Sequence, residues 1–207
     1  MTAPAARPRF SIVTAVYDVD PYLPAFIDSV ERLRVAAGDL QVVAVDDGST
    51  DGSLELLRDW ARRSRYAVDV LTKPNGGQAS ARNLGLEHAT GEWVTFPDPD
   101  DLLERDYLRA AARFAEGHPE VRIMSARPVL LREAAGRLGA AHPRHWQYRR
   151  GDRAADLTEE PNVFLGVSSG SFFRLDRIEP QRLRFDPRIR PNFEDAHFAV
   201  RYLLELP

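Results

Sequence analysis

The chain has 207 residues, of which 43% are hydrophobic and 29% charged, a composition typical of a soluble protein with one substantial core. Its formal net charge of -3 argues against binding nucleic acid or anionic lipid through overall charge. Cysteine is absent, which excludes disulfides, thiol catalysis and cysteine-ligated metals. No apolar run reaches the roughly 20 residues that span a bilayer, and the first ten residues lack the apolar stretch of a signal peptide. We expect a cytoplasmic chain with an N-terminal tail, 1–9, and a single domain, 10–207.

The first half of the chain alternates short apolar runs with segments of helical periodicity. The apolar runs predict strands at 10–16, 40–45, 67–71 and 93–96. The periodic segments predict helices over 23–37, from residue 54 to about 61, and over 77–89. This alternation predicts an α/β fold with a central, mostly parallel sheet flanked by helices. The ligand site of such a sheet lies at the carboxyl ends of its strands.

The second half is less regular. We predict a helix near 102–116, a strand near 121–131, a loop up to about residue 160, a strand within 162–174, and a final helix from Phe193 to the end. That helix has no polar tail after it, which indicates a domain truncated from a longer protein.

Two adjacent acids follow the second predicted strand and open an Asp- and Gly-rich turn. The turn is not a calcium loop of the EF-hand type, because Arg58 stands where a bidentate Glu is required. Ser49 or Asp51 could simply cap the next helix. Asp46 and Asp47 need more than capping, because neighbouring carboxylates repel unless something donates to them. A nucleobase or a ribose could supply those donors.

A glycine pair leads into the third predicted helix, within residues 73–83. Flexible glycines, exposed helix N–H groups and Arg82 are features that a diphosphate uses. The segment is neither a Walker loop nor a dinucleotide fingerprint, and an ordinary helix start is the alternative.

Two further acidic groups lie at Asp98-Pro99-Asp100-Asp101 and at Glu194-Asp195. Three carboxylates on one turn can hold a hard divalent ion whose shell is completed by phosphate oxygens; the alternative is a solvated turn with Asp101 as a helix cap. A carboxylate opening the last helix can act as a general base, or its place can reflect the helix dipole alone.

Taken together and in this order, the motifs resemble the family 2 glycosyltransferases of the GT-A fold. The segments that carry the resemblance are VTAVY at 13–17, VAVDDGSTDGS at 43–53, NGG at 75–77, ARNLG at 81–85, DPDD at 98–101 and ED at 194–195. It covers residues 10–206 and is strongest for modules of bacterial cell-wall and teichoic-acid-type polymer synthesis.

The resemblance implies inverting transfer of a sugar from a nucleotide-diphosphate donor, usually a UDP-sugar, with Mn²⁺ or Mg²⁺. The acceptor would be a hydroxyl of a glycan, a glycopolymer or a lipid-linked molecule at the inner face of the membrane. The implied nucleotide contacts are Ala15, Val16, Tyr17, Asp46, Asp47, Asn75, Arg82, Asp98 and Asp100. Asp100 and Asp101 would bind the metal, Asp195 would be the catalytic base, and Glu194 its neighbour. Such a displacement needs a base on the acceptor face and a Lewis acid on the leaving diphosphate.

The acceptor site is predicted to be bordered by Arg149, Arg150, Ser169 and Gly170, with a solvated loop as the alternative for the two arginines. In this family, residues beyond the last helix often close over the diphosphate, and the sequence stops at Pro207. The alternative function is therefore a non-catalytic nucleotide-sugar or glycopolymer-binding module of a larger polymer synthase. A receiver domain is excluded because its acid pair follows the first strand. A nucleotidyltransferase would need a basic, Gly-rich loop directly after the first strand, where this chain has Tyr17-Asp18-Val19-Asp20.

Overall fold

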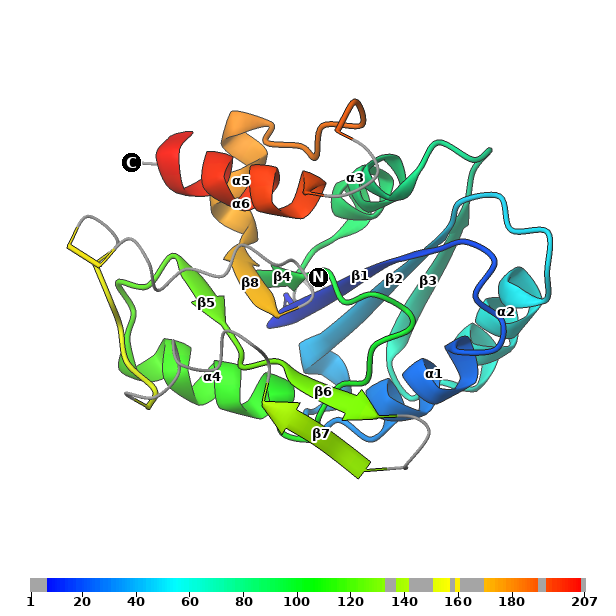
Figure 1. Ribbon diagram of the computed structural model, residues 1–207, viewed down its shortest axis with the longest axis horizontal. Helices are drawn as coiled ribbons and strands as arrows, with labels where there is room; N and C mark the ends of the chain where they lie inside the picture. The colour runs from blue at the N-terminus through cyan, green and yellow to red at the C-terminus, as the bar shows by residue number, and fades with distance from the viewer. Residues whose placement is uncertain are drawn as a thin grey trace, which may run out of the picture.

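A six-stranded sheet in the order β3-β2-β1-β4-β8-β5 forms the centre of the computed structural model (Figure 1). The structure describes residues 7–132, 137–141, 151–156, 159–160, 170–189 and 193–205. The parallel strands are β1 (Phe10–Val16), β2 (Leu40–Asp46), β3 (Ala67–Thr72) and β4 (Trp93–Thr95). β8 (Ser171–Arg174) runs antiparallel between β4 and β5 (Ile123–Ser125). The predicted α/β class and mostly parallel sheet are confirmed.

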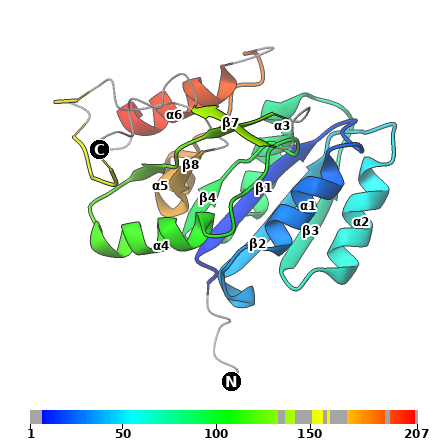
Figure 2. The ribbon, with the colours of Figure 1, turned by 60° about the horizontal axis from the view of Figure 1, so that its bottom comes forward.

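Helices cover both faces of this sheet (Figures 1 and 2). One face carries α1 (Leu23–Glu31), α2 (Ser53–Arg63) and α4 (Tyr107–Gly117). The other carries α3 (Gln78–His88), α5 (Leu175–Gln181) and α6 (Glu194–Glu205). Neighbouring strand residues divide between the two cores, as Ile12 and Val13 do. The central strands are therefore mostly apolar on both faces, with Ser11, Thr14 and Gln41 as buried polar exceptions.

α3 lies unusually close to the sheet. A Cβ atom at Gly85 would lie 2.4 Å from Val13 Cγ1 and 3.2 Å from Val45 Cγ2, so no larger residue fits without a shift. The glycine thereby lets α3 rest directly on β1 and β2 and fixes its height above the sheet. This matters for the site, because α3 carries Arg82.

An aromatic cluster holds α6 on the same face as α3. The Phe198 ring of α6 stacks on Phe185 with centroids 4.1 Å apart and meets Phe173 of β8 edge-on at 5.3 Å. Phe96, just after β4, contacts Phe185 and Phe198 at 4.9 and 5.8 Å. These buried rings place the first turn of α6 near the carboxyl end of β4.

Two predicted helices have different bounds in the structure. The first ends at Glu31, and a short 3-10 turn, Ala37–Asp39, precedes β2. The helix predicted to begin near residue 102 begins at Tyr107. Ahead of it, Leu103 is buried and its amide donates to Ser29 Oγ at 3.1 Å, which holds this stretch outside the helix.

The region after α4 was predicted wrongly in three respects. Residues 121–131 form two strands, not one: β5 pairs with β8, and β6 (Val129–Arg132) pairs with β7 (Arg137–Ala141) in a separate sheet. Pro128 precedes β6 and has no N–H to donate to a ladder, which accounts for the break. β7 lies in the predicted loop, and α5 was not predicted. Of the strand expected within 162–174, residues 171–174 are β8 and 161–169 lie outside the described residues.

The backbone ahead of β1 is also attached to the domain. Arg7 donates to the carbonyl oxygens of Thr90 and Gly91, both at 2.6 Å. Across the described part of the chain, no helix combines the length and apolarity needed to cross a bilayer.

Candidate functional site

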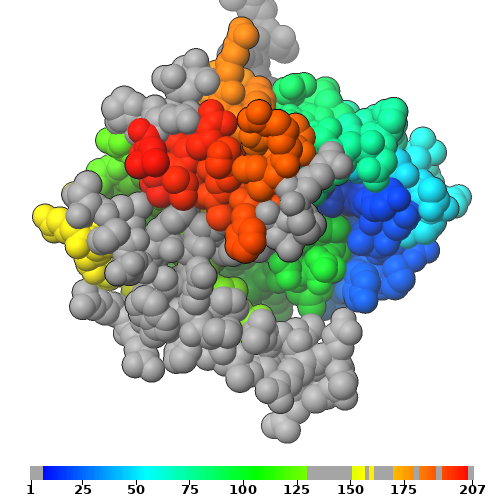
Figure 3. Space-filling model, turned by 45° about the horizontal axis from the view of Figure 1, so that its top comes forward, coloured from blue at the N-terminus to red at the C-terminus, as the bar shows by residue number. Residues whose placement is uncertain are grey.

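The acidic motifs gather where the parallel strands end. Asp46 ends β2 and Asp47 follows it, Asp98 lies shortly after β4, and Glu194 begins α6 above the same edge. In the space-filling view the surface of α6, in red, and the segment before it, in orange, lie beside that of α3, in blue-green (Figure 3). The site is thus at the edge predicted for an α/β sheet.

Asp47 is almost fully buried, and its carboxylate joins β2 to the loop before α3. It accepts the amides of Gly76 and Gly77 at 3.0 and 2.7 Å and forms an ion pair with Lys73. Asp46, also buried, accepts the amides of Gly48 and Ser49, both at 3.3 Å. The donors that we expected from a ligand come, in this structure, from the protein itself.

The loops after β1 and β2 exchange hydrogen bonds across the edge of the site. Asp18 Oδ1 accepts the amide of Thr50 at 2.6 Å, while Ser49 Oγ accepts the amide of Asp18 at 3.2 Å. Neither Ser49 nor Asp51 is the N-cap of α2, which is Gly52; Asp51, the residue before that cap, accepts the amide of Ser53, the first residue of α2, at 2.9 Å. This bracing holds the two loops together.

Arg82 bridges the two acidic groups that lie farther along the chain. Its side chain is 2% exposed. Nη2 lies 2.6 Å from Asp98 Oδ1, and Nη1 lies 2.9 Å from Glu194 Oε1. We predicted from the resemblance that Arg82 contacts the diphosphate, whereas both of its terminal nitrogens face carboxylates of the protein.

Asp98 shares its electrostatic environment with both acidic groups. Burial raises the pKa of its carboxyl group above the ordinary value, and the Arg82 charge acts in the opposite direction. The negative charges of Asp100 and Asp195 raise this pKa further, so both carboxylates lie near enough to interact electrostatically with Asp98. Asp98 also accepts a hydrogen bond from Gln78 Nε2 at 2.8 Å. The acidic turn and the start of α6 therefore belong to one site.

The acids predicted to bind metal are more accessible than Asp98, which is half-buried like the predicted base Asp195. Asp100 and Asp101 are exposed, and the amide of Asp101 donates to the Asp98 carbonyl at 3.1 Å in a tight turn. Asp195 is half-buried, and its Oδ1 accepts the amide of Ala196 at 2.7 Å. Phe193, just before α6, is 75% exposed and has a left-handed φ of 77°, a strained conformation for a residue with a side chain.

A metal ion fits this turn only with help from a ligand. Within the described ranges, no three His, Asp or Glu side chains gather as a metal cluster. Asp100 and Asp101 offer exposed carboxylate oxygens, the donors that Mg²⁺ and Mn²⁺ prefer, but only as part of a shell. The donor set therefore suits an ion that arrives with, or is completed by, phosphate oxygens.

The remaining predicted residues are placed as follows. Ala15 is half-buried, Tyr17 is 47% exposed, and Asn75 is exposed in the loop before α3. Val16 is fully buried, and its carbonyl accepts the Asp47 amide at 2.8 Å. The Gly170 carbonyl accepts the amide of Ala126 at 2.7 Å. Arg149, Arg150 and Ser169 lie outside the described residues.

Sequence reasoning gave no role to three residues that take part in this site. Lys73 pairs with Asp47, Gln78 donates to Asp98, and Phe193 stands exposed beside Glu194. A cation directly after a predicted strand and next to a Pro-Asn-Gly turn was a usable signal for Lys73. Nothing in the sequence marked the other two.

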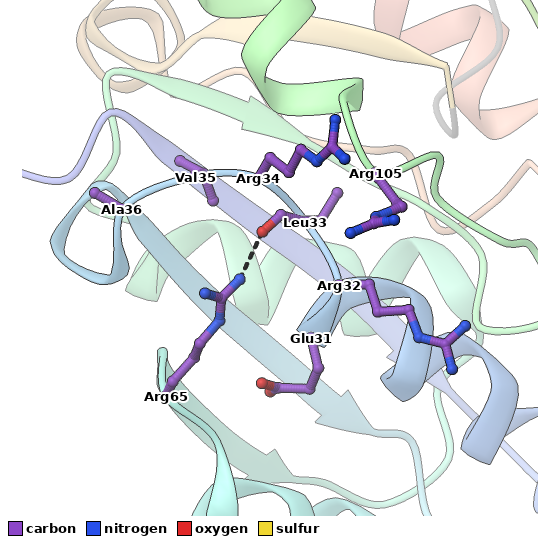
Figure 4. A pocket seen from close by; sticks show the side chains of 8 residues that line it. All are labelled: Glu31, Arg32, Leu33, Arg34, Val35, Ala36, Arg65 and Arg105. Carbon is purple, nitrogen blue, oxygen red and sulfur yellow. Dashed lines mark hydrogen bonds between the residues drawn. The ribbon is translucent and has the colours of Figure 1, made fainter.

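A hollow of about 610 Å³ lies at the opposite edge of the sheet (Figure 4). It is lined by Glu31, Arg32, Leu33, Arg34, Val35, Ala36, Arg65 and Arg105. Residues 33–36 lead toward β2 and Arg65 precedes β3, so the hollow faces the amino ends of these strands. Arg65 donates to the Leu33 carbonyl at 2.5 Å, and Arg32 and Arg34 form ion pairs with nearby acids. It is separate from the acidic site.

Known proteins resemble this chain in sequence. The family model described as "Glycosyl transferase family 2" matches residues 11–179. The minor teichoic acid biosynthesis protein GgaB of Bacillus subtilis is 29% identical over 187 residues, which cover 90% of this chain and 20% of GgaB.

Solved structures resemble the chain in fold, among them the following two. Residues 1–349 of S. aureus TarS in complex with UDP-GlcNAc give a TM-score of 0.79 at 22% identity, covering 94% of this chain and 53% of that one. The mannosyltransferase PcManGT from Pyrobaculum calidifontis, in complex with GDP-Man and Mn²⁺, gives a TM-score of 0.70 at 23% identity. This match covers 98% of this chain and 54% of the PcManGT chain. The predicted GT-A fold is confirmed. This chain spans about half of each of these two solved chains and a fifth of GgaB.

Proposed function

Because the chain belongs to glycosyl transferase family 2, we propose that it transfers a sugar from a UDP-sugar to a hydroxyl group of a cell-wall or surface glycopolymer, with inversion and with a divalent metal ion. The observation that carries the proposal is the buried Arg82 bridge. It joins the acidic turn after β4 to the acids that open α6. A displacement at a sugar carbon needs two such acidic groups on opposite sides of the sugar.

The nucleotide would lie over the ends of β1 and β2. Exposed Tyr17 and half-buried Ala15 are available to a base, and Asp46 and Asp47 lie beside them at the end of the neighbouring strand. Asn75 is exposed on the adjoining loop. UDP is favoured because the TarS crystal structure holds UDP-GlcNAc, although PcManGT holds GDP-Man.

Asp100 and Asp101 would hold the metal ion, with Asp98 kept in place by Arg82 and Gln78. A bound divalent ion supplies Lewis-acid stabilisation to the leaving diphosphate. This chain's own part is to present two exposed carboxylates on a turn that the buried Pro99 stiffens.

Asp195 would take the proton of the acceptor hydroxyl. The acceptor oxygen then forms the bond to the anomeric carbon as the bond from that carbon to the diphosphate oxygen breaks, and the proton ends on the Asp195 carboxylate. Glu194 is the less suitable base because it is buried and paired with Arg82. The N-terminus of α6 stabilises a negative charge at this position.

The acceptor class follows from the named relatives. GgaB takes part in minor teichoic acid synthesis, so a phosphate-containing surface polymer or its lipid-linked precursor is the acceptor that we propose. An acceptor of the second kind would bring the domain to the inner face of the membrane.

The first test is calorimetric titration of the chain with UDP, with and without Mn²⁺. The double variant Asp100→Ala, Asp101→Ala is compared with Asp39→Ala, an exposed acid outside the site. We expect UDP binding that Mn²⁺ strengthens in the wild type and in Asp39→Ala but not in the double variant. Without UDP, we expect Mn²⁺ to bind weakly, because the protein offers only part of a coordination shell.

The second test separates an enzyme from a binding module. The chain is incubated with UDP-GlcNAc and a poly(glycerol or ribitol phosphate) acceptor, and the anomeric configuration of the product is read by NMR. Inverted product that disappears in Asp195→Asn supports the proposal. UDP binding without transfer or hydrolysis of any UDP-sugar would favour the non-catalytic module.

A further inference from the structure

Resting on the proposed function, we propose that Arg82 is a positioning residue: it sets the base-bearing helix α6 against the acidic turn of the donor site and does not bind the diphosphate. The two carboxylates that it joins are far apart in the chain, 16 and 112 residues after Arg82. No local structure would bring them together. Their relative position depends on this one guanidinium and on the packing beneath it.

The burial of Arg82 gives the bridge its strength. A guanidinium stays charged in proteins, and a buried charge is tolerated only when it is paired and hydrogen-bonded. Arg82 is 2% exposed and meets this requirement with Asp98 at 2.6 Å and Glu194 at 2.9 Å. Moving either carboxylate away would leave a buried charge partly unpaired, which is strongly unfavourable.

Arg82 stands on a rigid support. Gly85 lets α3 rest directly on β1 and β2, as described above. The next residue, Asn83, exchanges two hydrogen bonds with the backbone of Phe185, at 2.9 Å to its carbonyl and 2.8 Å from its amide. The Arg82 guanidinium lies 5.5 Å from the centre of the Phe185 ring. α3 therefore holds both the acidic turn and the segment that leads to α6.

The start of α6 depends on the ion pair between Arg82 and Glu194. Phe193 takes a left-handed conformation at φ 77°, and a strained backbone persists only when its surroundings hold it. Glu194, the next residue, is fixed by Arg82, and Asp195 follows it on the same turn. Shifts of about 1 Å at a reacting group can cost orders of magnitude in rate. A fixed Glu194 thus fixes the place of the Asp195 carboxylate.

The test compares Arg82→Lys, Glu194→Gln and the double variant with wild type, using kcat and donor KM in the transfer assay and the UDP Kd by calorimetry. Lysine keeps the charge but cannot present two forked donors to two carboxylates. Arg188→Lys is the matched control, because Arg188 also pairs with a carboxylate but is 88% exposed.

We expect each single variant to lower kcat at least tenfold while the donor KM and the UDP Kd stay within threefold, with Arg188→Lys unchanged. The kcat of the double variant should be no lower than that of the slower single variant, because both substitutions remove the same interaction, the ion pair between Arg82 and Glu194. Hydrogen exchange at the amides of residues 196–198 should rise in Arg82→Lys, which reports a loosened α6.

Three results would overturn the proposal. A fall in UDP affinity parallel to kcat in Arg82→Lys would make Arg82 a nucleotide ligand, as the resemblance implied. Losses in kcat that multiply in the double variant would make the two residues independent, and an unchanged kcat would leave Arg82 without a positioning role. If Arg82→Lys does not fold, Glu194→Gln alone tests the proposal: a lowered kcat with an unchanged UDP Kd supports it, and an unchanged kcat overturns it. A wild-type chain that transfers no sugar refutes the proposed function instead, so the two failures are distinguishable.

Discussion

Replacing Asp47 with asparagine should destabilise the fold by about 2 to 4 kcal/mol. The Asp47 side chain is 3% exposed, and its carboxylate receives three donors: the Lys73 ammonium and the amides of Gly76 and Gly77. Hydrogen bonds to a charged group contribute about 1.5–3 kcal/mol each, and removing one partner of a buried pair costs about 3–5 kcal/mol. Asparagine keeps one acceptor oxygen, and Lys73 is 18% exposed and can regain water. The expected loss of stability is therefore somewhat smaller than the loss of about 3–5 kcal/mol for a fully broken buried pair.

The measurement is urea unfolding followed by far-UV circular dichroism, with the denaturant slope checked for constancy. Asp28→Asn is the control, because Asp28 pairs with Arg32 on the surface and its loss should change the free energy of unfolding by less than about 0.5 kcal/mol. A double-mutant cycle with Lys73→Met should give a coupling energy of about 1 kcal/mol or more between Asp47 and Lys73. An Asp47→Asn loss below about 1 kcal/mol would refute the reasoning that this carboxylate fastens the loop before α3.

Three further predictions concern packing, titration and strain. Gly85→Ala should cost about 1–3 kcal/mol, because the new methyl group meets Val13, whereas Gly38→Ala has open space and should cost nothing. Burial raises the pKa of Tyr202 to about 12 from 10.0, so its contribution to stability is present below pH 10 and is lost as the pH rises through 12. In a titration of absorbance at 295 nm, the folded chain should show late-ionising tyrosines, with Tyr107 and Tyr202 among them, and Tyr202→Phe should remove one of them while Tyr107 stays. Phe193→Gly should be more stable than Phe193→Ala by about 1 kcal/mol, because glycine adopts a positive φ without strain.

Each of these predictions has a plain contradicting result. Equal stabilities of Gly85→Ala and Gly38→Ala would mean that α3 can rise from the sheet at no cost. A Tyr202 that ionises near pH 10 in the folded chain would contradict the burial of its hydroxyl group, which raises its pKa. An alanine at position 193 as stable as glycine would show that the left-handed backbone there carries no strain.

Much of the fold could be predicted from sequence because the signals are local. A mostly apolar strand such as β2 indicates burial on both sides, and the two acids lie at its end, Asp46 as its last residue and Asp47 directly after it. Where the local signal was mixed, prediction failed: Arg and Gly in β7 hid its alternation, and the seven residues of α5 include a proline. The start of α4 was misplaced because a distant hydroxyl, Ser29 Oγ, takes the amide of Leu103.

The sequence by itself determined the class of fold, the edge of the sheet that carries the site, and the identity of its acids, because parallel strands must end together and each motif follows a strand or opens a helix. Only the tertiary structure decided which groups pair there. Asp47 is satisfied by Lys73 and the amides of the next loop, and Arg82 holds Asp98 and Glu194. The reason is physical: a buried charge takes the partner that the packing of α3 and α6 brings within hydrogen-bond reach, and separation along the chain does not encode that distance.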